Sequence, residues 1–373
     1  MGEKNTKNGW IVPLLLIVLI VAGSCGYFIG TSASTKRYKA EKEQEVLLNR
    51  SELALYDEVK GPIYVTGHKT PDSDTVGAAI GYANLLQKLG YDAHAVVLGK
   101  INAESEFILK AAKIETPKIL EDASGLNMIL VDHSEYMQSA PGLQDAKIIA
   151  VIDHHGVGSI FTGNQLIYDA RPLCSANTIV WFHYRNYGVE IDKQTAIVML
   201  GAILSDTGGL KFSTTTAADK AAGKNLADIA GITDIDAFYD EMRKFALSYT
   251  GMSDEEIFFS DYKEYLAGDK KFAIATIQVY DKQNSEKLAP RLKAVIPGAL
   301  VSRGMDMSFI QLAPSPKEHY LIASDEAAEE VLKIAFGEKL KREENFYVLT
   351  PGVSRRSVLV PEITNVLESH PTE

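Results

Sequence analysis

Residues 148–155 read IIAVIDHH, an apolar run that ends in three ionisable residues. Such a run predicts a strand buried on both faces, as in a parallel sheet covered by helices. Asp153, His154 and His155 follow at once, and three ionisable groups are costly to bury without partners. The alternative is a surface loop in which the histidines occur by coincidence. We favour a functional site at the carboxyl end of the strand.

Three further clusters place ligand-type residues directly after an apolar run. They are GHKTPDSD at 67–74, VDH at 131–133 and SDT at 205–207. We interpret the apolar runs as buried strands, although the run before Asp206 also closes a helical stretch at 192–205. Ligands of an open parallel sheet bind beyond the carboxyl ends of its strands, so we expect the four clusters to meet there.

The residue types in the clusters indicate divalent metal ions. In the first cluster, the spacing lets His68 and Asp72 share one ion while Asp74 reaches a neighbouring one. Taken alone, this loop is equally well explained as an Asp-rich turn with a helix cap, and a single Asp132 after a strand is more often a cap or turn residue. All four clusters together predict a two-metal site of the kind that hydrolyses phosphate compounds.

The arrangement of the apolar runs predicts an α/β protein with two domains. Alternating strands and helices between 62 and 230 are typical of a parallel sheet with right-handed crossovers. A turn-rich break at 249–253 indicates a domain boundary. A smaller α/β domain is expected after it, with the active site between the two. The strands of this second domain are expected at 272–279, 299–302, 307–312 and 320–323.

Charge and motif content exclude several classes of function. The formal net charge of -11 argues against a nucleic-acid partner, which would need clustered Lys and Arg. The phosphate-binding loop GxxxxGK[ST], the dinucleotide fingerprint GxGxxG and the nucleophile elbow GxSxG are all absent from the sequence. The two cysteines, Cys25 and Cys174, are too few for a Cys-based zinc site.

Residues 10–29 form an uncharged apolar segment near the start of the chain. Its length suits a transmembrane helix of about 20 residues. The alternative is a cleaved signal peptide, although the apolar core of a signal is shorter, about 7–15 residues. We therefore expect a single-pass protein of the cell membrane. Lys and Arg are more frequent after the segment, which favours a cytoplasmic position for the remaining chain. The expected domains are a tail at 1–9, a transmembrane helix at 10–29, a juxtamembrane linker at 30–58, a metal-binding domain at 59–250 and a substrate-binding domain at 251–373.

Cationic residues of the second domain are candidates for phosphate binding. Arg355 and Arg356 follow a Pro-Gly turn, and guanidinium groups bind oxyanions bidentately. Lys263 lies just past the domain break. The alternative for any one of them is a solvated surface charge, and for Lys263 alone that interpretation is the better one. The adjacent arginines are the better candidates for phosphate. Four other histidines are interpreted as structural or surface residues, namely His94, His183, His319 and His370.

Taken together, the motifs resemble the DHH phosphoesterase superfamily, and most closely its manganese-dependent, or family II, inorganic pyrophosphatases. The resemblance covers residues 62–361. It rests on Gly67-His68 with Pro71-Asp72-Ser73-Asp74, Leu98-Gly99 with Asn102, Glu104 and Phe107, Val131-Asp132-His133-Ser134-Glu135, Asp153-His154-His155, Leu204-Ser205-Asp206-Thr207, and Pro351-Gly352-Val353-Ser354-Arg355-Arg356 with Val360-Pro361. In the family pattern, Arg-Lys-Lys follows the serine of the last motif, where this chain has Arg355-Arg356-Ser357. The stretch 297–317 matches the pattern poorly.

The resemblance implies a role for each matching residue. One metal ion would be bound by His68, Asp72 and Asp132. A second would be bound by Asp74, Asp132, His154 and Asp206, with Asp132 bridging the two. His155, Lys263, Arg355 and Arg356 would bind the phosphates and, with Asp132, form the catalytic set. Asp153 would orient the histidines from behind, as metal-bound imidazoles usually require.

The activity implied is that of a membrane-anchored inorganic pyrophosphatase, which hydrolyses diphosphate to two phosphates with a water activated by two metal ions. Manganese is the first choice of metal, with magnesium and cobalt as further candidates. One alternative is a short-chain polyphosphatase or another phosphoanhydride or phosphodiester hydrolase of the superfamily. A different alternative is a membrane sensor that binds phosphate compounds without turnover. A homodimer is a further open expectation.

Overall fold

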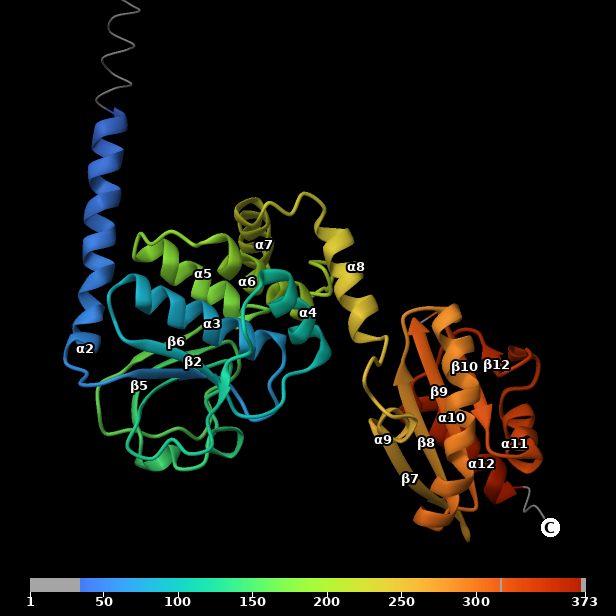
Figure 1. Ribbon diagram of the computed structural model, residues 1–373. Helices are drawn as coiled ribbons and strands as arrows, with labels where there is room; N and C mark the ends of the chain where they lie inside the picture. Colours follow the sequence, from blue (N-terminus) through green and yellow to red (C-terminus); the bar gives the residue numbers. More distant parts are fainter. Residues whose placement is uncertain (1–33, 316, 370–373) are drawn as a thin grey trace, which may run out of the picture. The chain divides into compact units, whose positions relative to one another are not determined.

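The computed structural model describes residues 34–315 and 317–369 (Figure 1). Contacts within the chain divide it into two compact units. The first comprises the residues up to Ile101 together with Leu109–Thr233, and the second comprises Asn102–Ile108 and the residues from Asp234 onward. The domain boundary expected after residue 250 stays a prediction. Each unit is described by itself.

The first unit is built on a parallel six-stranded sheet with the order β3-β2-β1-β4-β5-β6. Its strands are β1 (Ile63–Thr66), β2 (Ala93–Val97), β3 (Lys118–Ile119), β4 (Asn127–Val131), β5 (Lys147–Asp153) and β6 (Ile167–Ala170). Strands β4 and β5 are buried almost throughout, which explains their continuous apolar sequences. The parallel sheet predicted for this part of the chain is confirmed. The strand order changes direction between β1 and β4, where sheets of this kind bind ligands.

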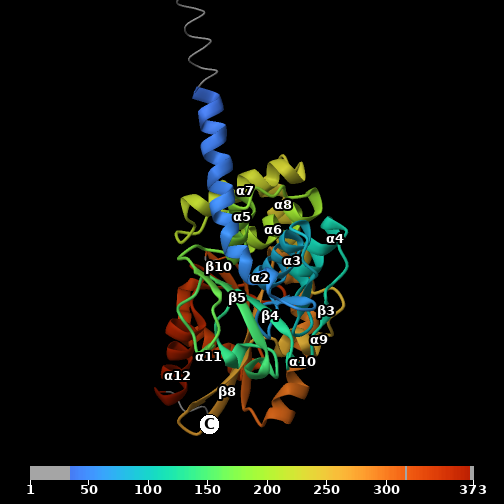
Figure 2. The same ribbon diagram turned by 90° about the vertical axis from the view of Figure 1, so that its left-hand side faces the viewer.

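Helices cover one face of this sheet and loops cover the other. The helices of the first unit are a helix over residues 34–49, α2 (Ala54–Asp57), α3 (Ser73–Lys88), α5 (Ala176–Asn186), α6 (Lys193–Asp206) and α7 (Ala217–Ala230). Helix α4 (Ala103–Ala112) is divided between the two units. Helix α3 packs against α5 and α6, and Figure 2 shows α3 and α6 beside each other above β4 and β5. On the opposite face, Ala123, Ala140 and Leu143 pack on buried side chains of β4 and β5.

The second unit has a mixed sheet with the order β11-β12-β10-β9-β8-β7. Its strands are β7 (Tyr262–Ala267), β8 (Lys270–Gln278), β9 (Met307–Ser315), β10 (Glu318–Ala323), β11 (Leu340–Arg342) and β12 (Tyr347–Leu349). Its helices are α8 (Ile235–Ala246), α9 (Asp254–Phe259), α10 (Lys282–Arg303), α11 (Glu326–Phe336) and α12 (Val360–Ser369). Strands β8 and β9 are parallel and are joined by α10, while the other pairs are antiparallel. Two buried clusters form its core, one with α9 and α10 and one with α11 and α12.

Two apolar runs that were interpreted as strands belong to helices. Residues 299–302 are not a strand but the end of α10, because only Ala299 of this apolar run is buried, at helical spacing from Leu292 and Ile296. Val301 is 86% exposed. For the run before Asp206, the helix predicted at 192–205 is confirmed as α6, with Asp206 as its last residue, and the strand interpretation is wrong. Helix α6 is apolar nearly all round because it is buried between α3 and α7, so its sequence lacks the polar face that identifies most helices.

The membrane-anchored part of the predicted fold is not supported. Across residues 34–315 and 317–369, no helix combines the length and apolar character that a bilayer crossing requires. The predicted span at 10–29 lies outside the described residues. This finding corrects both the transmembrane helix in the predicted fold class and the single-pass, cytoplasm-facing localisation that was inferred from it.

Candidate metal centre

His68, Asp72 and Asp132 form the first ligand group of the site. His68 lies in the loop after β1, Asp72 is the N-cap of α3, and Asp132 follows β4. The Nε2 atom of His68 lies 3.4 Å from Asp72 Oδ2 and 3.3 Å from Asp132 Oδ2. Such spacing brings one ligand atom from each residue to a common point. The loop approaches closely because Gly67 has no side chain, and a Cβ there would lie 2.4 Å from Thr75 Cγ2.

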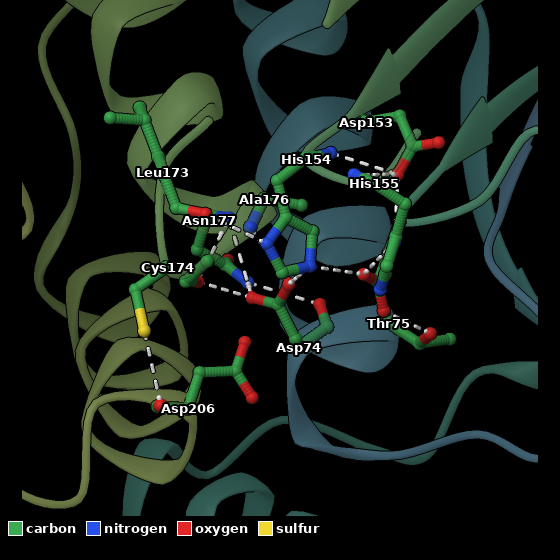
Figure 3. Close-up of polar contacts among 12 residues, drawn as sticks. Asp74, Thr75, Asp153, His154, His155, Leu173, Cys174, Ala176, Asn177 and Asp206 are labelled. Atoms are coloured by element: carbon green, nitrogen blue, oxygen red, sulfur yellow. Dashed lines mark hydrogen bonds and ion pairs between the residues drawn. The ribbon is translucent and has the colours of Figure 1, made fainter. Parts of the chain in front are cut away.

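Asp74, His154 and Asp206 form the second group, drawn in Figure 3. The Nε2 atom of His154 lies 3.6 Å from Asp74 Oδ2 and 3.0 Å from Asp132 Oδ1. Within the described part of the chain, the buried Oδ2 of Asp206 has no hydrogen-bond partner. Burial and the neighbouring Asp74 and Asp132 raise the pKa of Asp206 well above its usual range. A buried carboxylate oxygen without a partner is costly, and other carboxylates nearby add to the cost. A bound cation would stabilise it.

Asp132 connects the two groups through its two oxygens. Its Oδ2 faces His68 and accepts a hydrogen bond of 2.7 Å from Thr75 Oγ1, while its Oδ1 faces His154. Burial alone would raise the pKa of Asp132, but hydrogen bonds from His154 and His68 outweigh it and lower this pKa. The backbone of Asp132 has φ of 60°, a left-handed conformation that Asp and Asn tolerate better than most residues. The carboxylate is therefore ionised and aimed at both groups.

Asp153 orients the two histidines that follow it. Its Oδ1 accepts hydrogen bonds from the backbone N–H groups of His154 (2.8 Å) and His155 (3.1 Å) and lies 3.0 Å from His155 Nδ1. The Nδ1 of His154 lies 3.0 Å from the carbonyl oxygen of Leu173, to which it donates, and this leaves Nε2 free to face Asp74 and Asp132. The side chain of His155 is 57% exposed, and its Nδ1 lies 3.8 Å from Asp132 Oδ1.

His133 has a different role from its neighbours. It is buried, with Nδ1 2.9 Å from the carbonyl oxygen of Val131 and Nε2 2.9 Å from Ser139 Oγ. Burial lowers the pKa of His133, which favours the neutral ring. Both ring nitrogens are used in holding the loop after β4, and the ring packs edge-on against His68 with the ring centroids 6.4 Å apart, so this histidine supports the first group without offering it a ligand atom.

The N-terminus of α5 holds Asp74, a feature that the sequence analysis missed. Ser175 Oγ donates to Asp74 Oδ1, and the backbone N–H of Ala176 donates to Oδ2 at 2.7 Å. The Asn177 amide donates to Oδ1 at 2.8 Å and to the backbone carbonyl of Asp74 at 3.0 Å. Figure 3 shows Ala176 and Asn177 turned toward Asp74. The signal was present as a serine at the N-cap of an apolar helix, but only the fold shows what the helix end faces.

The cationic candidates lie in the second unit, around a cavity of about 560 Å³. Arg355 and Arg356 both line it, together with Arg243, Gln311 and His319, among others. Two nitrogens of Arg355 donate to Asp261, to its carbonyl oxygen and to Oδ1, each at 2.8 Å. The Arg356 side chain is exposed. Lys263 is exposed on β7 and is not among the described residues that line this cavity.

The histidines of the two groups give a testable pH dependence. Burial opposes protonation of His68, but hydrogen bonds to Asp132 and Asp72 outweigh it and raise the pKa of His68 to about 10. Burial is likewise outweighed by Asp132 and Asp74, which raise the pKa of His154 to about 9. At neutral pH both rings of the metal-free protein are protonated, and a cation must displace these protons. We expect the affinity for Mn²⁺ to rise by about tenfold per pH unit for each proton released between about pH 6 and 8.

Calorimetry of Mn²⁺ binding in buffers of different ionisation enthalpy counts all the protons released, those of the two rings together with any from Asp206, whose pKa is also raised. A proton count near zero, or an affinity independent of pH, would show that both rings are already neutral before the metal binds.

Comparison with known proteins identifies the family. The model of the DHH family, N-terminal domain, matches residues 62–203, and that of the DHHA2 domain matches residues 240–366. A probable manganese-dependent inorganic pyrophosphatase of Clostridium acetobutylicum is 35% identical over 308 residues, which cover 82% of this chain and 98% of the relative. The manganese-dependent inorganic pyrophosphatase of Bacillus subtilis is 33% identical over 307 residues, with 82% and 98% covered.

A solved structure agrees with these sequence relatives. The crystal structure of a candidate family II inorganic pyrophosphatase from Methanococcus jannaschii is 32% identical, covers 81% of this chain and 98% of its own, and has a TM-score of 0.53. In each of these comparisons the match covers nearly the full length of the related protein. The chain therefore belongs to the family of manganese-dependent, or family II, inorganic pyrophosphatases, within the DHH phosphoesterase superfamily.

Proposed function

We propose that this protein is a metal-dependent hydrolase that cleaves inorganic diphosphate into two phosphates. The observation that carries the proposal is the pair of ligand groups beside Asp132, whose Oδ2 faces His68 of the first group and whose Oδ1 faces His154 of the second. Membership of the pyrophosphatase family agrees with it. The ligand groups favour hydrolysis of a phosphate compound, and the relatives favour diphosphate as the substrate.

The residues present fit two divalent cations. Carboxylate and imidazole donors suit manganese, and the unpartnered Asp206 oxygen lies where a cation would satisfy it. We assign His68, Asp72 and Asp132 to one ion, and Asp74, His154, Asp206 and again Asp132 to the other. When bound, two such ions lower the pKa of an attacking water and stabilise charge on the reacting phosphate.

The remaining residues of the proposal bind and orient. Asp153 fixes the imidazole of His155, whose exposed side is free for a phosphate oxygen. Arg356 is exposed at the cavity of the second unit and would bind phosphate bidentately. Arg355 keeps donors free beyond the two that Asp261 accepts, since a guanidinium carries five. Lys263, on β7, stays in the proposed set as a third cation.

A substrate panel tests the proposal. The purified protein is assayed with diphosphate, triphosphate, longer polyphosphate and nucleotides, with and without Mn²⁺. We expect diphosphate to be the best substrate and hydrolysis to require the metal, because the phosphate chemistry needs both ions. Faster hydrolysis of triphosphate or polyphosphate would instead favour the polyphosphatase alternative, which Ser357 in place of the family's lysine makes worth testing. Tight binding without turnover of any phosphate would favour the sensor.

A further inference from the structure

We infer that His319 and Gln311 are positioning residues that hold the backbone leading into the arginine pair. The inference rests on the proposed function of Arg356 and deepens it. Neither residue belongs to the motifs that resemble the family, and Gln311 lies in a stretch that matches the family pattern poorly. Their importance follows from what they contact.

The two side chains bind both backbone groups of one residue, Val353. Gln311 Nε2 donates to the carbonyl oxygen of Val353 at 2.8 Å. The N–H of Val353 in turn donates to His319 Nδ1 at 3.1 Å. Gln311 Nε2 also donates to His319 Nδ1 at 2.8 Å, so the three residues form a closed set of contacts. Val353 has no strand or helix partner of its own, and these side chains replace one.

Neighbouring strands hold this set in place. Gln311 lies on β9 and His319 on β10, which pair antiparallel. The hydroxyl of Thr276, on β8, donates to Gln311 Oε1 at 3.0 Å and so determines which way the amide faces. Gln311 is only 1% exposed. Both N–H donors and the oxygen of this buried amide make hydrogen bonds, so the amide has one orientation. It therefore holds the carbonyl group of Val353 in a fixed position.

The contacts require a neutral His319. Its Nδ1 accepts two hydrogen bonds and therefore carries no proton. Burial lowers the pKa of His319, with opposition from backbone hydrogen bonds, and this favours the neutral ring. The charged groups that line the same cavity are Arg243, Arg355, Arg356 and Asp261. Three arginines against one aspartate disfavour an imidazolium there, so His319 acts as an acceptor for the backbone rather than as a further cation for phosphate.

The consequence is a chain segment held on both sides of Ser354. Val353 is held by Gln311 and His319, and Arg355 is held by Asp261. Arg356 is the next residue and lines the cavity with an exposed side chain. With its backbone already fixed, Arg356 loses less conformational freedom when it binds an anion, which strengthens binding without any new contact.

Two substitutions of His319 test the inference. His319→Leu removes the acceptor, whereas His319→Asn keeps a side-chain oxygen near the position of Nδ1. We expect His319→Leu to raise both KM for diphosphate and Kd for inorganic phosphate by about tenfold, the size of one or two hydrogen bonds. kcat should stay within about twofold, and Mn²⁺ affinity should not change, because the acceptor acts on substrate binding. His319→Asn should recover most of the loss. The control is His94→Leu, an exposed histidine on β2 that should change neither constant.

Other outcomes overturn the inference. Equal losses in His319→Leu and His319→Asn would mean that the imidazole itself contacts phosphate. Unchanged KM and Kd with a lowered melting temperature would mean a purely structural role. If His319→Leu does not fold, Thr276→Val removes only the contact that orients Gln311 and should raise both constants by about two- to threefold; no change there contradicts the inference. Failure of the proposed function can be distinguished from failure of this inference. In the first case the wild-type protein would not hydrolyse diphosphate, and the Kd for inorganic phosphate would still test His319.

Discussion

Asp132→Ala is expected to abolish diphosphate hydrolysis, with a loss in kcat of at least about 10³-fold. The substitution removes a carboxylate whose two oxygens face both ligand groups, so both proposed ions lose a ligand at once. Metal ions contribute several kcal/mol to this kind of chemistry, and each 1.36 kcal/mol is a factor of ten in rate. The measurements are steady-state hydrolysis with added Mn²⁺ and calorimetric Mn²⁺ stoichiometry, which should fall together.

Asp132→Asn separates loss of charge from loss of fold. Alanine is disfavoured at the left-handed φ of 60° found at this position, by roughly 1–2 kcal/mol, whereas asparagine tolerates it. We expect the asparagine variant to be folded and also nearly inactive. The control is Asp228→Ala, an exposed carboxylate on α7 that should leave activity unchanged. Retained activity in either Asp132 variant would rule out a shared bridging ligand and with it the proposed two-metal site.

Arg356→Ala is expected to raise KM for diphosphate by about 10–100-fold, with a smaller change in kcat. A hydrogen bond to a charged group contributes about 1.5–3 kcal/mol, which is this range in affinity. Arg356 is the exposed arginine of the pair, whereas Arg355 is partly committed to Asp261. Arg355→Ala should therefore lower thermal stability as well as affinity, because it frees the Asp261 carboxylate.

Arg37→Ala serves as the control for these arginines. It removes an exposed arginine whose ion pair with Glu41 lies within one helix, and such pairs contribute little. An unchanged KM in Arg356→Ala would show that this side chain does not bind substrate. A fall in kcat alone would mean that Arg356 contacts the transition state and not the bound substrate. Arg356 would then still belong to the site, but with a different role.

The parallel sheet was predictable because its strands are buried on both faces. Strands β4 and β5 are continuous apolar runs, and each is followed directly by an Asp or His that marks its carboxyl end. The same feature misled the prediction at 299–302 and before Asp206, where an apolar run belongs to a buried helix face. A short apolar run cannot distinguish the two, because periodicity needs more residues than such a run contains.

The two parts of the site differ in how far a motif could predict them. Ligand-type residues next to strand ends stand out in the sequence, and their assignment to two ions stays a prediction that the variants above test. The contacts of Asp74 with Ser175, Ala176 and Asn177 gave no comparable signal, since any N-capped helix has such residues. His319 was interpreted as structural or surface, and only the fold shows that it lines the cavity with the arginines.

Sequence alone established the family and the kind of chemistry, because the residues concerned form short local motifs at the ends of apolar runs. Tertiary structure was needed to show which oxygen of Asp132 faces which histidine, what the end of α5 binds, and how Gln311 and His319 reach Val353. The physical reason is that these contacts join residues far apart in the chain. They depend on strand register and helix packing, which are set by the whole core and not by any local pattern.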